Sequence, residues 1–222
     1  MHIEELRTEL QSRANPDQIE AMAAYMKDRF EFMGVRAPAA REAAKPSLAA
    51  AKDADADELI AFVDDCWDEP EREFQYVGCI VLRRWISTLE PEHLGDLERY
   101  VTTKSWWDTV DALAIWSVGR LVFANRELAE VMDQWIESDD FWLARTAILH
   151  QLSFKADIDA ERLYRYAEAR AQDSEFFIRK AIGWALRDHA RLDPDGVRAF
   201  VAANEERLSG LSKREALKRI GQ

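Results

Sequence analysis

The chain has 222 residues, of which 48% are hydrophobic, so it can bury a large core, and the composition favours a folded chain over a disordered one. It has eight glycines and six prolines, too few for the turns of a β-sandwich or barrel, and no apolar run near the roughly 20 residues that span a bilayer. The formal net charge of −12 argues at first against a nucleic-acid partner, because phosphate binding needs a basic surface. Composition therefore predicts an all-α, soluble, cytoplasmic protein.

Helix breakers and capping residues predict about thirteen helices joined by short connections. The N-terminal segment MHIEELRTELQSR is amphipathic and charged, unlike a signal peptide. Pro16, Pro91 and Pro194 each lie at or near a first helical position, where the missing N–H costs little. The predicted helices cover residues 2–13, 16–32, 38–51, 55–67, 69–87, 91–101, 105–122, 126–137, 140–153, 158–171, 174–190, 193–204 and 212–220.

A repeated segment opens four of these helices. The copies are EREFQYVG from Glu71, SWWDTVDA from Ser105, DFWLARTA from Asp140 and EFFIRKAI from Glu175, at steps of 34, 35 and 35 residues. The last three carry an aromatic pair at their second and third positions. Such a period is typical of stacked helix pairs that curve into a solenoid, and we expect the repeated helices to line its concave surface.

The second copy places two carboxylates on one helix. Ser105 and Asp108 have the spacing of a helix cap, so we expect Asp108 to be structural. The predicted buried stripe of this helix holds Trp106, Val110, Leu113 and Ser117. Trp107 and Asp111 are one turn apart at the edge of that stripe. Asp111 therefore has two interpretations: an ion-paired helix carboxylate, or an anion that holds a cation beside an indole.

The fourth copy alternates aromatic and basic residues on one face. Its predicted buried stripe is Ile178, Ala181, Ile182, Ala185 and Leu186, and the other side holds Phe177, Lys180, Trp184, Arg187 and Arg191. Aromatic and basic side chains on one face suit sugar or base contacts flanked by phosphate contacts. Arg145 of the third copy has the register of Lys180. It is expected either to face the same way or to form an intrahelical ion pair.

The charge is distributed unevenly along the chain. Residues 176–222 contain ten Lys and Arg against six Asp and Glu, whereas residues 1–175 contain 20 against 36. The basic C-terminal segment near Lys213 and Arg214 is therefore expected to join Arg145, Lys180 and Arg187 in binding phosphates.

Five motifs in order resemble the AlkD-type DNA alkylation repair glycosylases, over about residues 5–220. They are YMKDRFEFMGV (25–35), EREFQYVG (71–78), SWWDTVD (105–111), FWLARTAILHQL (141–152) and FFIRKAIGWALRD (176–188). The resemblance implies one HEAT-like α-superhelical domain over residues 1–222 that cups duplex DNA. It also implies excision of N3- and N7-alkylated purines, such as 3-methyladenine and 7-methylguanine, without flipping the lesion into a pocket.

The resemblance also implies roles for individual residues. The carboxylate of Asp111 matches the catalytic one, and the indoles of Trp107 and Trp184 match those that pack against the deoxyribose of the lesion. Arg145 matches an arginine that contacts the adjacent DNA backbone. Tyr25 matches a residue that lines the same cleft. The strong negative charge of the chain departs from what DNA binding requires.

The chemistry of such lesions fits a site with one carboxylate. An alkylated purine already carries positive charge and leaves as a neutral base, so no second carboxyl is needed to protonate it. A fixed carboxylate and indole faces stabilise the oxocarbenium character that develops on the sugar. SWWDTVD contains no lysine that could form a Schiff base, so we expect a monofunctional glycosylase. His2, His93, His150 and His189 are dispersed, and Cys66 and Cys79 have apolar neighbours, so no metal or cofactor is expected.

A second interpretation stays open: a HEAT-like scaffold that binds a protein or nucleic acid without chemistry. The two carboxylates of SWWDTVD offer a test. We expect Asp108→Ala to lower stability by about 1 kcal/mol and Asp111→Asn to slow excision while leaving folding nearly intact. A monomer is the simplest expectation for a protein that wraps DNA.

Overall fold

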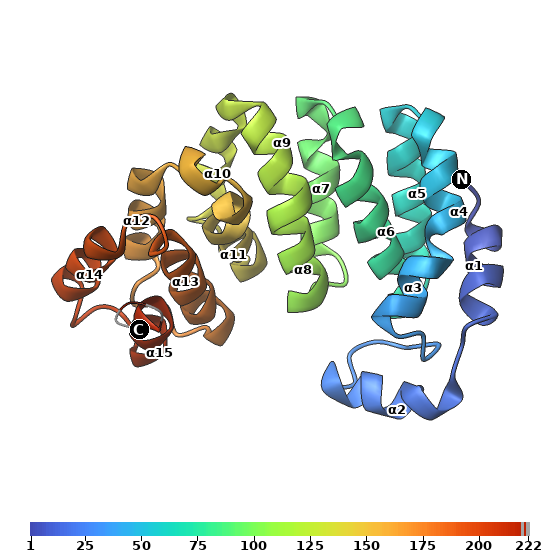
Figure 1. The fold of residues 1–222 in the computed structure, drawn as a ribbon, viewed down its shortest axis with the longest axis horizontal. Helices are drawn as coiled ribbons and strands as arrows, with labels where there is room; N and C mark the ends of the chain where they lie inside the picture. Colours follow the sequence, from blue (N-terminus) through green and yellow to red (C-terminus); the bar gives the residue numbers. More distant parts are fainter. Residues whose placement is uncertain (219, 221–222) are drawn as a thin grey trace. The chain divides into compact units, whose positions relative to one another are not determined.

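The computed structural model describes residues 1–218 and 220. Regular structure in these residues is helical, apart from one isolated parallel bridge between Glu31 and Glu71. The helices group into two compact units, Met1–Asp96 and Leu97–Gln222 (Figure 1). The predicted all-α fold is confirmed, and the single domain over residues 1–222 stays a prediction.

The first unit begins with a short helix and ends with a packed helix pair. Its helices are α1 (Ile3–Gln11), α2 (Pro16–Tyr25), α3 (Ala37–Ala43), α4 (Lys45–Ala50), α5 (Ala56–Asp68) and α6 (Arg72–Trp85). α5 and α6 pack against each other, and Cys66 and Cys79 are buried on them as predicted. The predicted helix 38–51 is divided at Ala44, because Pro46 in the first turn of α4 cannot donate a backbone hydrogen bond.

A buried carboxylate fixes the connection between α2 and α3. Glu73 of α6 is fully buried and accepts hydrogen bonds from the backbone N–H groups of Met33 at 3.1 Å and Val35 at 2.9 Å. Burial raises the pKa of this carboxyl, and the backbone donors oppose the shift. Gly34 between them has a φ of 83°, which favours glycine. The connection is therefore held to α6 by charge-assisted hydrogen bonds.

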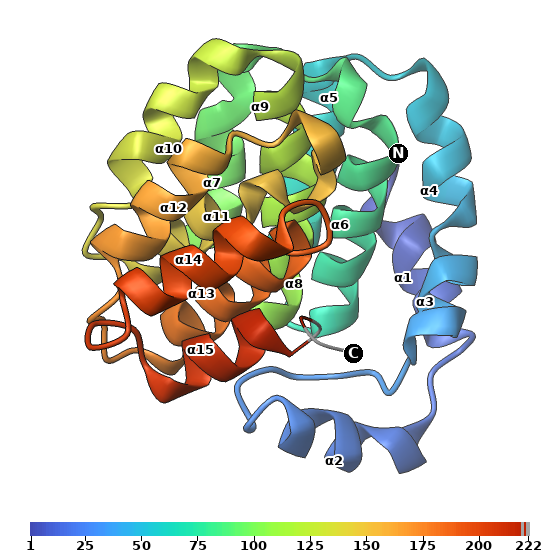
Figure 2. The ribbon, with the colours of Figure 1, turned by 60° about the vertical axis from the view of Figure 1, so that its left-hand side comes forward.

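The second unit contains the last three repeated segments. Its helices are α7 (Leu94–Thr102, which begins just before the boundary), α8 (Trp107–Leu113), α9 (Gly119–Ala124), α10 (Ala129–Trp135), α11 (Phe141–Leu149), α12 (Ala160–Ala169), α13 (Phe176–His189), α14 (Pro194–Ala203) and α15 (Gly210–Leu217). The repeated helices α8, α11 and α13 follow one another through the unit, with α11 in contact with both others (Figures 1 and 2). The predicted stacking of repeats is therefore present within this unit.

α8 and α9 form one continuous helical path through a wide π turn at Ala114–Val118. The chain approaches the end of α11 very closely here: a Cβ at position 119 would lie 2.1 Å from the carbonyl oxygen of His150, so only glycine fits. The hydroxyl of Ser153 donates to the carbonyl of Ile115 in the π turn at 3.3 Å. The turn thus carries the helix of the second repeat against the end of the third.

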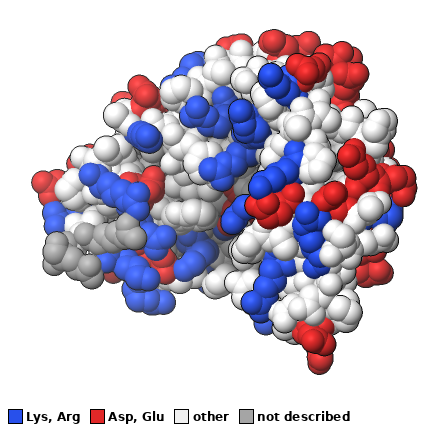
Figure 3. Space-filling model, turned by 45° about the vertical axis from the view of Figure 1, so that its right-hand side comes forward, with Lys and Arg blue, Asp and Glu red and all other residues white. Residues whose placement is uncertain are grey.

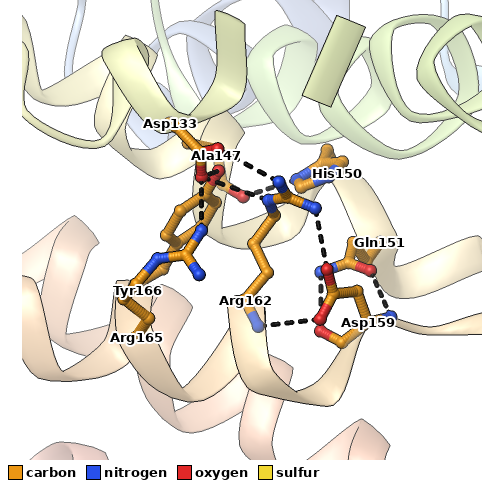
Figure 4. A network of polar contacts seen from close by, with 8 residues as sticks. All are labelled: Asp133, Ala147, His150, Gln151, Asp159, Arg162, Arg165 and Tyr166. Atoms are coloured by element: carbon orange, nitrogen blue, oxygen red, sulfur yellow. Dashed lines mark hydrogen bonds and ion pairs between the residues drawn. The ribbon is translucent and has the colours of Figure 1, made fainter. Parts of the chain in front are cut away.

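A polar network joins α10 to α12 away from the repeated helix starts (Figure 4). Asp133 of α10 accepts from Arg162 Nε at 3.1 Å, from Arg165 Nη2 at 2.7 Å and from the Tyr166 hydroxyl at 2.7 Å. Hydrogen bonds from Arg162 hold the pKa of Asp133 below its usual range. His150 beside it is buried, which lowers its pKa to about 4, and its Nδ1 lies 2.6 Å from the carbonyl oxygen of Ala147. This network accounts for His150 as a structural residue.

Within residues 1–218 and 220, no helix combines the length and apolar character needed to cross a bilayer.

Candidate functional site

The three repeated helices of the second unit begin at equivalent positions. Their N-caps are Trp106, Asp140 and Glu175. Asp111, Arg145 and Lys180 are each the fifth residue after the N-cap of their own helix. Because adjacent repeats stack, residues in this register come from three neighbouring helix starts.

The predicted cap at Ser105 is wrong, because α8 begins later than its sequence suggests. Trp106 is the N-cap, in extended conformation, and its side chain makes no cap hydrogen bond. The Ser105 hydroxyl instead donates to the carbonyl of Val101 at 2.7 Å, at the end of α7. Asp108 lies in the first turn of α8, where its negative charge interacts favourably with the helix N-terminus. Trp106 is therefore outside α8 and only partly buried, in contrast to the predicted stripe, whereas Val110, Leu113 and Ser117 are buried as expected.

A bidentate ion pair joins the second repeat to the third. Arg145 of α11 donates from Nε to Asp111 Oδ1 at 2.8 Å and from Nη2 to Oδ2 at 2.9 Å. Its Nη1 donates to the carbonyl oxygen of Phe177, at the start of α13. Arg145 is 3% exposed, and the side chain of Asp111 is 17% exposed. The guanidinium thus fixes a partly accessible carboxylate from both of its oxygens.

The intrahelical ion pair that the sequence offered as one alternative for Arg145 is not the pair that the structure shows. Its ion pair is between helices and not within α11, and its three guanidinium nitrogens all donate to protein atoms. The repeat register predicted that Arg145 faces the surface, but its guanidinium is buried. Contact between this residue and a DNA phosphate stays a prediction.

Burial and charge act on the Asp111 carboxyl in opposite directions. Burial raises its pKa above the ordinary value of 3.8, and Arg145 lowers it by its charge and its hydrogen bonds. The charge of Asp108 adds a smaller increase. Burial is the largest of these effects, so the pKa of Asp111 lies above that of an exposed aspartate.

An aromatic cluster packs around this ion pair. The Phe177 ring contacts Trp106 with centroids 5.1 Å apart and Trp142 with centroids 4.9 Å apart. Arg145 lies over the same Phe177 ring, at 5.7 Å from its centroid. Phe141 stacks on Phe177 at 6.3 Å. At least one aromatic residue from each of the three pairs therefore lies in one cluster, although the repeat pattern by itself predicts only separate pairs.

The family resemblance implies that the indoles of Trp107 and Trp184 contact the deoxyribose of the lesion. In the sequence one precedes and the other follows the Asp111–Arg145 ion pair. Trp107 is the first residue of α8, one turn before Asp111, and it is half-buried. Trp184 is four residues after Lys180 on α13 and is also half-buried. Both are therefore partly accessible side chains on the repeated helices.

The basic face of α13 is paired with an acid from α15. The predicted buried stripe of α13 is confirmed, and Lys180, Trp184 and Arg187 lie half-buried outside it. Lys180 Nζ lies 2.8 Å from Glu215 Oε1, and Arg187 donates to Glu215 Oε2. Glu215 thus neutralises part of the predicted phosphate-binding stripe.

The other predicted DNA-binding residues are separate from this pair. Lys213 Nζ binds the side chain of Glu205 at 2.6 Å, and Arg214 is exposed on α15. Tyr25 ends α2 in the first unit and is 68% exposed. Figure 3 shows the same mixture of signs over one face, where groups of blue Lys and Arg side chains have red Asp and Glu side chains beside them.

Two features of the site were missed by sequence reasoning, although the repeat contains a signal for each. Arg145 follows Asp111 by 34 residues and Glu215 follows Lys180 by 35, which is one repeat in both cases. Opposite charges one repeat apart predict ion pairs between stacked helices. The backbone carbonyl of Phe177 has no sequence signal, because any residue supplies one.

The described part of the chain contains no group of three or more His, Cys, Asp and Glu side chains placed to hold a metal ion.

Comparisons with known proteins agree with this architecture. A family model described as a DNA alkylation repair enzyme matches residues 6–220. A solved structure titled as a predicted DNA alkylation repair enzyme from Enterococcus faecalis is 29% identical, with a TM-score of 0.88, and the match covers 95% of this chain and 98% of that one. AlkD2 from Streptococcus mutans is 17% identical with a TM-score of 0.66, over 92% of this chain and 100% of that one, which shows similarity of fold. No curated protein matches. The family match extends over nearly the whole sequence, and the chain therefore belongs to the DNA alkylation repair enzyme family.

Proposed function

We propose that this protein is a monofunctional DNA glycosylase that hydrolyses the N-glycosidic bond of cationic N3- and N7-alkylated purines in duplex DNA. Membership of a DNA alkylation repair family supports DNA as its partner. The observation that carries the proposal is the Asp111 carboxylate, which Arg145 holds by both oxygens while 17% of its side chain stays exposed. A carboxylate fixed in this way can stabilise positive charge without first reorganising.

The proposed reaction needs one anion and one water molecule. As the bond between C1′ and the purine nitrogen breaks, its electron pair neutralises the positive charge of the base, which leaves without a proton from the protein. The sugar develops oxocarbenium character, which Asp111 stabilises electrostatically. Water then attacks C1′ and loses a proton to solvent. Trp107 and Trp184 present aromatic faces that favour the same developing cation.

Arg145 acts in this proposal as a positioning residue. Its charge favours the ionised form of Asp111 and so opposes the effect of burial on the pKa, and its third nitrogen ties the pair to the start of α13 through Phe177. The second lone pair of each Asp111 oxygen can still accept a hydrogen bond, so the carboxylate can also orient the water.

The test is release of 3-methyladenine or 7-methylguanine from methylated duplex DNA, measured by chromatography under single-turnover conditions with EDTA present. We expect wild-type protein to release a base and to leave an intact strand with an abasic site. Strand cleavage by the enzyme itself would contradict the monofunctional assignment. DNA binding with no release, at any enzyme or salt concentration, would instead support a scaffold that binds DNA without chemistry.

A further inference from the structure

The basic face of α13 is occupied by a carboxylate that belongs to the last described helix. Lys180 and Arg187 are seven residues apart, which is about two helical turns, so they project from the same side of α13. They bind different oxygens of one Glu215 carboxylate. Two cations that reach one carboxylate in this way have the arrangement that also suits one phosphate group, because both anions accept from the same donors.

Glu215 is held in place by the packing of its helix. A Cβ at Gly183 of α13 would lie 2.5 Å from Glu215 Cβ and 2.9 Å from the Ser212 carbonyl oxygen, so α15 approaches α13 at a glycine (Figure 2). The Ser212 hydroxyl donates to the carbonyl of Arg179 at 2.9 Å, and Ala216 is fully buried. The carboxylate is therefore a fixed part of the second unit.

The cations themselves remain accessible. The side chain of Lys180 is 39% exposed and that of Arg187 is 23% exposed, whereas that of Glu215 is 14% exposed. Lys180, Arg187 and Lys218 together lower the pKa of Glu215, so the carboxylate is ionised at neutral pH. A phosphate that approaches this face meets two cations whose charge is already partly neutralised.

We propose that Glu215 is a built-in competitor for DNA phosphate at Lys180 and Arg187, and that it lowers the affinity of the protein for undamaged duplex DNA. The inference rests on the proposed function, since it takes duplex DNA as the partner. A phosphate must share the two cations with Glu215, which repels it. Low affinity for undamaged DNA lets the enzyme dissociate and sample other sites. The lesion itself is recognised by residues other than Lys180 and Arg187.

The experiment measures binding to a fluorescently labelled, undamaged duplex by anisotropy over a range of salt concentrations. Glu215→Gln removes the charge but keeps the shape of the side chain. We expect it to bind about five- to twentyfold more tightly at low salt, the effect of removing one like charge near a phosphate in an aqueous environment. The log–log salt slope should steepen by about 0.9, which corresponds to one more neutralised phosphate.

Two controls separate a local effect from a change of net charge. Glu168→Gln makes the same change in charge at an exposed carboxylate that pairs with Arg207, and should change affinity by less than about twofold. In a Lys180→Met, Arg187→Met background, Glu215→Gln should give no gain. Equal affinities for Glu215→Gln and Glu168→Gln would overturn the inference.

A third variant guards against displacement of α15. Glu215→Asp keeps the charge, so it should bind DNA about as weakly as wild type even if its melting temperature falls. A gain for Glu215→Asp equal to that for Glu215→Gln would show that helix displacement, and not charge, controls affinity. If the wild type binds and excises but Glu215→Gln gives no gain in DNA affinity, this inference fails and the proposed function stands. If neither protein binds DNA at low salt, this inference and the proposed function both fail.

Discussion

Two ion pairs connect residues one repeat apart, and they differ in what surrounds them. In the Asp111–Arg145 pair the cation is an arginine that is 3% exposed and donates to both oxygens of the carboxylate. In the Lys180–Glu215 pair the cation is a lysine that is 39% exposed, and the carboxylate also binds Arg187. The same repeat spacing thus produces one buried pair and one that solvent and ligands can reach.

This difference indicates which charge of each pair is available. A buried planar guanidinium with two parallel hydrogen bonds fixes its partner, so the more accessible charge of the first pair is the carboxylate. An exposed ammonium is a point charge that can change partners at little cost, so the more accessible charges around Glu215 are the cations. The repeat therefore presents an anion at one step and cations at the next.

The largest expected effect comes from removing the buried cation. Arg145→Met leaves Asp111 buried without its partner, and we expect the free energy of unfolding to fall by about 3–5 kcal/mol at neutral pH. The folded-state pKa of Asp111 then rises further, so this destabilisation should diminish as pH falls toward the ordinary pKa of 3.8. Urea unfolding at several pH values measures both effects. A loss below about 1 kcal/mol would make the pair equivalent to an exposed one.

Removing the charge of the anion should affect catalysis next most strongly. Asp111→Asn is expected to slow single-turnover excision by about tenfold to a thousandfold, as for the loss of one preorganised electrostatic stabiliser. The earlier expectation that folding stays intact needs correction, because this variant leaves the buried Arg145 without a charged partner. We now expect stability to fall by about 2–4 kcal/mol as well. Rates are therefore compared well below each melting temperature.

Asp108→Asn is the matched control for that experiment. It makes the same change of charge three residues away on α8, in the first turn. Loss of a favourable helix-dipole interaction should cost about 0.3–1 kcal/mol of stability and leave the excision rate within about twofold of wild type. An equal loss of rate in both variants would remove the distinction between the two carboxylates.

The two carboxylates of the pairs should titrate on opposite sides of their ordinary values. Burial raises the pKa of Asp111 above 3.8, whereas Lys180 lowers the pKa of Glu215 below 4.5. Excision needs ionised Asp111, so its rate should decrease as pH falls through the raised pKa. The stabilising contribution of Glu215 is present above pH 4.5 and should be lost only as pH falls through its lowered folded pKa. NMR titration of ¹³C-labelled carboxyl groups measures both values, and titration of Asp111 below Glu215 would reverse the comparison.

The smallest expected effect is on stability at the exposed pair. Lys180→Met should change the free energy of unfolding by less than about 1 kcal/mol, because more than a third of the Lys180 side chain is exposed and its ion pair is screened. The melting temperatures of Lys180→Met and Arg145→Met, measured under the same conditions, provide the direct comparison. A loss as large as that of Arg145→Met would show that both pairs are structural and that neither cation is available to a ligand.

The sequence by itself determined the elements that depend on local pattern. Apolar periodicity predicted the buried stripe of α13, and the 34- to 35-residue repeat identified Asp111, Arg145 and Lys180 before any partner was known. The buried stripe is confirmed, because helical periodicity is set by residues near one another in the chain, whereas the functional roles of the three charged residues stay predictions. Family resemblance pointed to Asp111 and Arg145 as well, through motifs that preserve that spacing, but not to Lys180.

The tertiary structure decided which groups these residues contact. Ser105 was expected to cap the helix that follows it, but its bond to Val101 is determined by where α7 ends. The burial of Arg145 and the position of Glu215 against α13 depend on packing between helices that lie one repeat apart. A local pattern places a charge on a helix face, but only the neighbouring repeat determines whether that charge is buried, paired or open to a ligand, because desolvation and ion pairing arise from contacts between elements.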